Sequence, residues 1–325
     1  MSIDQGLYFP AEIAAVIRKG VPLLLAGDVR LLSLLPQGEW IAGSTNMFFL
    51  PSGQGATSYD RIFACPLPDF VTGVDIREYD GNSLRHIFNE APADGFTVLI
   101  LPFGSDPHLS YAVNAGSYEN FATRPVCGWV SGGASLATIM TDKCYAVSGI
   151  NRQAYTDKAV AMHIQFPSDK YAELHIFNPY RQGNEKIRFL TSGIVVKDVL
   201  INGVQRNFAE YLHETAFDLN LPFVADYSGA LINVVVSSIN GDEVNMTTPV
   251  FPSLDYCIGE IDVRMKEADT VDDPVAFSVY CISNFLKPKI SELYPKKMSG
   301  PMVFGEIAYQ LLNKTTVYVT TGNTV

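Results

Sequence analysis

The sequence predicts a mixed α/β protein of the α+β class, with large mixed β-sheets and peripheral helices in two domains or lobes. Short apolar runs of strand length recur along the whole chain, bounded by glycine, proline or polar turn residues. Amphipathic helical spacing is confined to a few short segments. With 325 residues, 47% of them hydrophobic and 18% charged, the chain is long enough for two ordinary domains or one large one.

In the N-terminal half, helices are expected to alternate with buried strands. A helix is expected over 10–19, because Pro10 suits a first helical turn and Gly20 follows the last one. The run at 96–103, between two glycines, is typical of a central strand. The remaining expected elements are strands at 21–27, 39–50 (broken at Gly43) and 61–67, a loop at 51–60 and a helix around 83–89.

The C-terminal half is expected to consist mainly of strands. Residues 159–166 and 172–179 flank a polar turn and predict a hairpin. A strand, a turn at Asn202-Gly203 and an amphipathic helix follow; further strands are expected at 229–239, 257–265, 275–285 and 313–319. The polar segment 179–188 marks the expected boundary, which gives domains at 1–188 and 189–325.

Charge and composition exclude several classes of partner. The 34 acidic and 23 basic residues give a net charge of -11, so neither nucleic acid nor a membrane surface is an expected partner. No targeting segment is recognised, and the most apolar window, 21–35, contains Asp28 and Arg30. The five cysteines are widely spaced and odd in number, which favours a reducing cytoplasm over a disulfide framework.

The two tryptophans begin similar strings. Trp40 leads through two residues into Gly43-Ser44-Thr45, and Trp129 leads in the same way into Gly132-Gly133-Ala134. Two interpretations are open, a chance match or two pseudo-equivalent strands that end at similar tight turns. Such turns allow a close approach of backbone and ligand.

The end of the chain resembles the C-terminal domain of FIST proteins, a family of bacterial sensory modules. Gly305, Glu306, Ile307, Asn313 and Thr315 match its closing pattern residue by residue. The strand at 276–284 is similar to a second motif, in which Cys281 matches and Asn284 stands where an arginine is expected. Asn202-Gly203 and Tyr211 are similar to the family's strand–turn–helix motif.

The first half resembles the FIST N-terminal domain. Gly43, Ser44 and Thr45 retain part of a Gly-Cys-Ser-Thr-Ala-Gly-Glu motif that here lacks the cysteine and the trailing Gly-Glu, and the turn at Gly132-Gly133 resembles a second motif. The resemblance assigns 1–188 and 189–325 to the two FIST domains. It implies a non-catalytic sensor of a small molecule, with haem as the ligand of some members. The chain carries no kinase, methyl-acceptor or DNA-binding segment, so a separate output protein is expected.

The expected ligand site is a cleft where the turns and the C-terminal segment converge. Its candidates are Gly43, Ser44, Thr45, Gly132, Gly133, Gly305, Glu306 and Asn313. Glu306 is either an acceptor for a ligand or a structural group that fixes the last strand, because a carboxylate among apolar strands requires a partner. Ser44 and Thr45 either cradle a polar ligand or cap a turn.

Two other functions are weighed against ligand sensing. A hydrolase would use Ser135 in a Gly-x-Ser-x-small turn, with His163, His175 or His213 as its base. A structural or interaction protein would present an exposed apolar face and no sizeable pocket.

Histidines His163 and His175 are the candidates for a metal or haem ligand. In the expected hairpin they face opposite sides, and a shift by one residue would bring them to the same face. The alternative is that each imidazole has a structural partner. Cys127 and Cys281 are expected to be buried thiols, and no phosphate-binding or dinucleotide-binding loop is present.

Overall fold

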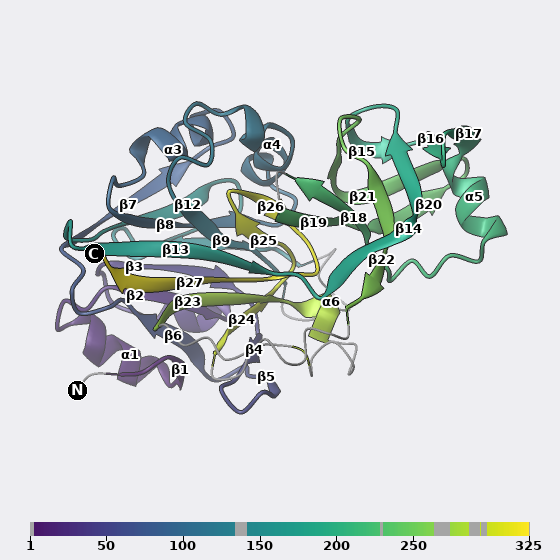
Figure 1. The fold of residues 1–325 in the computed structure, drawn as a ribbon. Coiled ribbons are helices and arrows are strands. Elements are labelled where there is room, and N and C mark those ends of the chain that lie inside the picture. The colour runs from purple at the N-terminus through teal and green to yellow at the C-terminus, as the bar shows by residue number, and fades with distance from the viewer. Residues whose placement is uncertain are drawn as a thin grey trace.

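The computed structural model describes residues 3–133, 142–227, 230–262, 274–285, 293 and 298–324. The fold is mixed α+β: the described strands form several sheets, and the helices are few, short and peripheral (Figure 1). A large lobe contains three sheets, and a smaller lobe projects from it. Within the described ranges, no helix is long and apolar enough to cross a membrane.

Sheet 1 and sheet 2 are six-stranded and share one strand arrangement. In order across sheet 1 lie β1 (Gly6–Tyr8), β6 (Ile62–Pro66), β2 (Leu23–Gly27), β3 (Trp40–Ser44), β10 (Ala146–Ser148) and β11 (Gln153–Tyr155). In order across sheet 2 lie β7 (Gly73–Tyr79), β12 (Ala159–Gln165), β8 (Gly95–Pro102), β9 (Val126–Ser131), β25 (Glu306–Ala308) and β26 (Gln310–Leu312).

Sheet 3 repeats the arrangement a third time. In order across it lie β13 (Lys170–Phe177), β27 (Thr316–Asn323), β23 (Val275–Cys281), β24 (Gly300–Val303), β4 (Met47–Phe49) and β5 (Gly55–Thr57). In each of sheets 1 to 3 the third and fourth strands are parallel and the other neighbours are antiparallel. The large lobe is therefore built from three units of one topology: unit 1 (6–66), unit 2 (73–165) and unit 3 (170–323).

The units exchange hairpins. In each unit, the two strands that follow the third strand and precede the last one form a hairpin. That hairpin joins the sheet of another unit. The β4–β5 hairpin of unit 1 extends sheet 3, β10–β11 of unit 2 extends sheet 1, and β25–β26 of unit 3 extends sheet 2. Each of the three sheets thus contains strands of two units.

One hydrophobic core lies between the three sheets. Phe63 of sheet 1, Trp129 of sheet 2 and Phe277 of sheet 3 belong to it, and the rings of Trp129 and Phe277 stack at 5.7 Å. Helices cover the outer faces of two sheets. Sheet 1 is covered by α1 (Pro10–Ile17) and α2 (Val29–Leu32). Sheet 2 is covered by η1 (Ser83–His86), α3 (Ile87–Glu90), α4 (Asp106–Asn114) and η2 (Ala115–Ser117).

The second lobe is an insertion between β13 and β23 of unit 3, where the other units have helices. Its larger sheet contains β17 (Val204–Asn207), β16 (Asp198–Ile201), β14 (Tyr180–Phe189), β22 (Tyr256–Ile261), β18 (Phe223–Tyr227) and β19 (Ala230–Val234). Its smaller sheet contains β15 (Gly193–Val196), β21 (Glu243–Val250) and β20 (Val236–Asn240). Helix α5 (Phe208–Glu214) packs into this lobe through Phe208, and α6 (Ile282–Phe285) follows β23.

The sheets divide the chain differently from the expected boundary at Arg188. That residue lies inside the continuous strand β14. The strands from Val275 to Asn323 return to the large lobe and pair there with strands of units 1, 2 and 3. The reason is that a polar segment with turn residues also suits a solvent-exposed strand, and β14 alternates exposed and buried positions over part of its length.

The predicted hairpin of 159–166 and 172–179 is wrong. Both segments are strands, but β12 pairs with β7 and β8, whereas β13 pairs with β27 in a different sheet. Two smaller expectations also differ. The strand at 39–50 breaks at Thr45-Asn46 instead of Gly43, and the loop at 51–60 contains β5.

The two tryptophans lie in equivalent strands, β3 of unit 1 and β9 of unit 2. Their positions are not equivalent, because Trp40 packs with α1 on the outer face of sheet 1 and Trp129 lies in the central core. The structure therefore agrees with pseudo-equivalent strands. The two tryptophans themselves, however, do not occupy equivalent positions in those strands.

Candidate functional site

A hollow of about 500 Å³ lies at the carboxyl ends of β2, β3 and β9. Ligand sites in α/β proteins favour this edge, because the loops that follow parallel strands meet there. The residues that line this hollow come from the ends of these strands and the segments that follow them or precede β10: Asp28, Val29, Arg30, Ser44, Thr45, Asn46, Gly132, Gly133, Asp142, Lys143 and Tyr145. The turns after Gly43 and after Ser131 therefore converge in one concavity, although they belong to different units.

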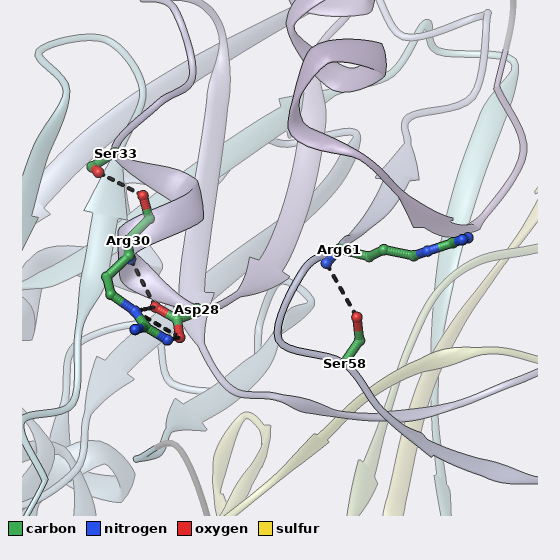
Figure 2. Close-up of polar contacts among 5 residues, drawn as sticks. All are labelled: Asp28, Arg30, Ser33, Ser58 and Arg61. Atoms are coloured by element: carbon green, nitrogen blue, oxygen red, sulfur yellow. Dashed lines mark hydrogen bonds and ion pairs between the residues drawn. The ribbon is translucent and has the colours of Figure 1, made fainter.

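An aspartate–arginine pair stands at the edge of the hollow. Asp28 caps α2, where its Oδ1 accepts the backbone N–H of Arg30 at 2.9 Å. The Arg30 guanidinium donates Nε–H to Oδ1 at 3.0 Å and Nη2–H to Oδ2 at 2.5 Å (Figure 2). These bonds hold the pKa of Asp28 below its usual value. Asp28 is buried and Arg30 is 77% exposed, so the carboxylate fixes the guanidinium at the surface.

The hydroxyls of Ser44 and Thr45 hold the turns together. Ser44 Oγ donates to the carbonyl of Gly132 at 2.7 Å and accepts the backbone N–H of Tyr145 at 2.8 Å. The backbone N–H of Gly132 in turn donates to the carbonyl of Ser44 at 2.9 Å. Thr45 Oγ1 donates to the carbonyl of Met302 at 3.0 Å, which ties unit 1 to unit 3. Thr45 Oγ1 also accepts the backbone N–H of Met47 at 3.3 Å, which fits the predicted capping of a turn, whereas the Ser44 hydroxyl bridges to distant segments instead.

Two of the predicted site glycines are required by packing. A Cβ on Gly43 would lie 2.4 Å from Nε1 of Trp129, and Gly43 does not line the hollow. A Cβ on Gly132 would lie 1.8 Å from the ring of Phe304. These distances are too short for any side chain, so the glycines admit the neighbouring rings.

Glu306 lies apart from the hollow, in the interior of the large lobe. It begins β25 and pairs with Trp129 of β9, and its side chain is fully buried. Its Oε2 accepts the backbone N–H of Thr315 at 3.1 Å and the Thr315 hydroxyl at 2.9 Å. Its Oε1 accepts no hydrogen bond from the described part of the chain. The structural interpretation, in which Glu306 fixes the segment before the last strand, fits these contacts.

Burial raises the pKa of Glu306 to about 8, against the lowering effects of the Thr315 hydrogen bonds, the nearby Cys281 thiol and the charge on Lys314. Lys314 is itself buried and donates to Ser283 Oγ at 3.3 Å. Burial also raises the pKa of the Cys281 thiol to about 12, which agrees with the expected buried, un-ionised cysteine. Gly305 precedes this cluster and Asn313 lies buried near it; neither lines the hollow.

The candidate haem ligands do not lie together. His163 is buried in β12, where Nδ1 is 2.8 Å from Thr97 Oγ1 and Nε2 is 2.9 Å from Tyr79 Oη. Burial lowers the pKa of His163 to about 4. His175 lies in a different sheet, bonded through Nε2 to Thr320 Oγ1 at 2.8 Å and stacked on Tyr318. Both ring nitrogens of His163 have protein partners, so it does not fit the role of a haem ligand.

The hydrolase candidate Ser135 lies outside the described residues. Among the described histidines, His163 is engaged at both nitrogens, and His213 is exposed in the second lobe.

Sequence reasoning did not single out Asp28, Arg30 and Lys143 as site residues. A signal was present for the first of them, because an aspartate directly after a buried strand is a good helix N-cap. No local pattern marked Lys143, which reaches the hollow through the connection from unit 2 to its exchanged hairpin.

The comparisons with known proteins bear on the family alone. No curated protein and no solved structure matches the chain. The model of a family of unknown function, DUF6976, matches residues 8–322, a range that covers nearly all of the three units and the whole second lobe. The chain therefore belongs to the DUF6976 family.

Proposed function

We propose that the protein is a cytoplasmic, non-catalytic sensory module that binds a small polar molecule in the hollow and acts on a separate output protein. The observation that carries the binding is the Arg30 guanidinium, fixed by Asp28 beside two converging turns. The sensory role and the output partner rest on the FIST resemblance of Gly43–Thr45, the Gly132–Gly133 turn and the 305–315 segment.

The charges of the hollow favour a ligand with an acidic group. Arg30 and Lys143 are exposed cations in its lining, and a guanidinium that is already held by a carboxylate loses little freedom when it binds an anion. Asp28 and Asp142 share the lining, so a ligand that also carries an amine or hydroxyl donor fits better than a simple anion.

The hydrogen bonds of the Ser44 and Thr45 hydroxyls favour a binding site over a catalytic site. Ser44 and Thr45 both donate to backbone carbonyls, and neither is hydrogen-bonded to a histidine or a carboxylate that could act as a base. A nucleophile would need such a base within hydrogen-bond reach.

Native mass spectrometry of the freshly purified protein tests the binding. We expect a small adduct, or an increase in Tm with a member of a panel of small carboxylates, amino acids and phosphate. Arg30→Ala should abolish either signal with only a small loss of stability, because the guanidinium is exposed and Asp28 keeps its bond from the backbone N–H of residue 30. Arg61→Ala is the matched control: in Figure 2 its side chain extends away from the Asp28–Arg30 pair, and it stacks on Phe9 at 4.4 Å. An adduct that persists in Arg30→Ala, or no signal in any assay, contradicts the proposal.

A further inference from the structure

A second concavity lies between the two lobes. It has a volume of about 270 Å³ and separates α4, η2 and β26 of the large lobe from the β18–β19 hairpin and the end of β21. Both sides are in contact around it, because α4 packs against β21 and β19 against β26. We call this concavity the interlobe cleft, and the hollow that contains Arg30 the Arg30 hollow. The described linings of the two have no residue in common. Interfaces between lobes are frequent ligand sites.

The described lining of the interlobe cleft is uncharged. None of its described lining residues is an aspartate, glutamate, lysine, arginine or histidine. Ile232 and Val234 form a nearly fully buried apolar wall, and Leu311, Pro249 and Phe251 extend it. A charged ligand would lose its hydration here without a counter-charge, so the cleft selects an uncharged molecule.

Several polar side chains in the described lining have no hydrogen-bond partner within the described part of the chain. Thr248 is 3% exposed, and its Oγ1 has no hydrogen-bond partner within the described part of the chain. Neither the Tyr227 hydroxyl nor the Gln310 amide is hydrogen-bonded to a described residue. A buried hydroxyl without a partner is costly, and a ligand donor or acceptor would offset that cost. In the Arg30 hollow, by contrast, the hydroxyls of Ser44 and Thr45 already donate to backbone carbonyls.

The floor of the interlobe cleft is held in place before any ligand binds. Asn233 of β19 lines the cleft and exchanges two side-chain hydrogen bonds with Asn178, at 2.9 and 3.0 Å. Its Nδ2 also lies 3.2 Å from the carbonyl of Lys314, which belongs to the large lobe. These bonds fix the second lobe against unit 3, so the ligand would enter a preformed space.

We propose that the interlobe cleft is a second binding site, for a compact uncharged molecule of phenol or indole size that carries one hydroxyl or N–H group. The apolar walls bury the ring, and Thr248, Tyr227 and Gln310 supply hydrogen bonds to the polar group. This site is independent of the proposed ligand of the Arg30 hollow.

Fluorine NMR with 4-fluorophenol and 5-fluoroindole as probes tests the proposal, with the charged 4-fluorobenzoate and 4-fluorobenzylamine as comparison. We expect saturable binding of at least one uncharged probe and at least tenfold weaker binding of both charged ones. Gly116→Phe should abolish binding, because a Cβ on Gly116 points into open space facing Tyr227 Oη at 3.8 Å. Thr248→Val should weaken binding about fivefold through loss of one hydrogen bond.

Thr248→Val also separates recognition from folding. Because the wild-type hydroxyl has no partner among the described residues, its removal should leave Tm unchanged or raise it while binding weakens. Arg30→Ala should bind the probes as the wild type does. The proposal is overturned if neither uncharged probe binds saturably, if Thr248→Val binds as tightly as the wild type, or if the charged probes bind equally well.

Discussion

The turn after β3 in unit 1 and the turn after β24 in unit 3 occupy equivalent positions in the shared topology. Each follows a strand that runs parallel to its predecessor, and each leads into a hairpin exchanged with another sheet. The first turn places Ser44 and Thr45 at the wall of a hollow. The second leads directly to Glu306, which is fully buried.

The difference shows that an equivalent position in the topology does not determine the environment of the polar side chains there. The hydroxyls of the first turn are neutral and satisfy backbone groups beside solvent. The carboxyl of the second lies in the core beside Trp129, where burial favours its protonated form. The surroundings of each turn decide whether its polar residue can meet a ligand.

Glu306 gives the largest expected effect. Glu306→Ala should reduce the free energy of unfolding by about 3 kcal/mol at pH 6.5, because it leaves a cavity and an unpaired Thr315 N–H. Glu306→Gln should cost less than about 1 kcal/mol, because its amide oxygen can still accept from Thr315. Urea denaturation measures both. Equal losses in the two variants would contradict a hydrogen-bonded, protonated carboxyl.

The same carboxyl predicts a pH dependence. Its folded pKa is raised from 4.5 to about 8, so its stabilising contribution is complete below pH 4.5 and is lost as the pH rises through about 8. His163 acts oppositely, because its folded pKa of about 4 lies below 6.5 and stability is lost as the pH falls between these values. Between pH 6.5 and 8, therefore, wild-type stability should fall by about 1–2 kcal/mol relative to Glu306→Gln. A constant difference across that window would exclude the raised pKa.

A pair of glycine substitutions gives an intermediate effect. Gly43→Ala should cost about 2 kcal/mol, because the new methyl group would overlap the Trp129 indole. Gly305→Ala should cost about 0.5 kcal/mol, since its nearest neighbours are ends of the Val130 and Leu311 side chains at 3.0 and 3.2 Å. Thermal unfolding compares the two. A larger loss in Gly305→Ala would show that the second turn is the more tightly packed one.

Ser44 gives a smaller expected effect than Glu306 or Gly43. Ser44→Ala should cost about 1 kcal/mol, through loss of the bonds to the Gly132 carbonyl and the Tyr145 N–H. Ser33→Ala is the matched control with a cost near zero, because Ser33 Oγ bonds to the Arg30 carbonyl at an exposed position. If both variants unfold at the same Tm, the Ser44 bridge does not stabilise the turn.

Local pattern was enough to predict most strands and the mixed fold class. The apolar run at 96–103 became β8, buried along its whole length, and the helix containing Phe208, Tyr211 and Leu212 buries those three residues. The pairing of strands was not predictable in this way, because partners such as Phe48 and Pro301 are far apart in the sequence. For the same reason the hairpin of β12 and β13 was expected in error, and the inserted lobe was not recognised.

For the candidate site, the sequence identified turns but not their exposure. Ser44, Thr45, Gly132 and Gly133 do line one hollow. Gly43 and Glu306 were grouped with them because flexible and charged residues suggest a site, yet both lie in the core. Exposure depends on the three-sheet packing, which the one-dimensional pattern does not contain.

The exchange of hairpins also has a consequence for how the protein is made. Sheet 2 lacks two of its six strands until the β25–β26 hairpin has been synthesised. Sheet 3 needs strands from both ends of the chain. Such a native state has high contact order and is reached slowly, after most of the chain has left the ribosome. Until then β9 and β4 have open edges, so nascent chains should depend on chaperones and should aggregate more readily than the finished protein.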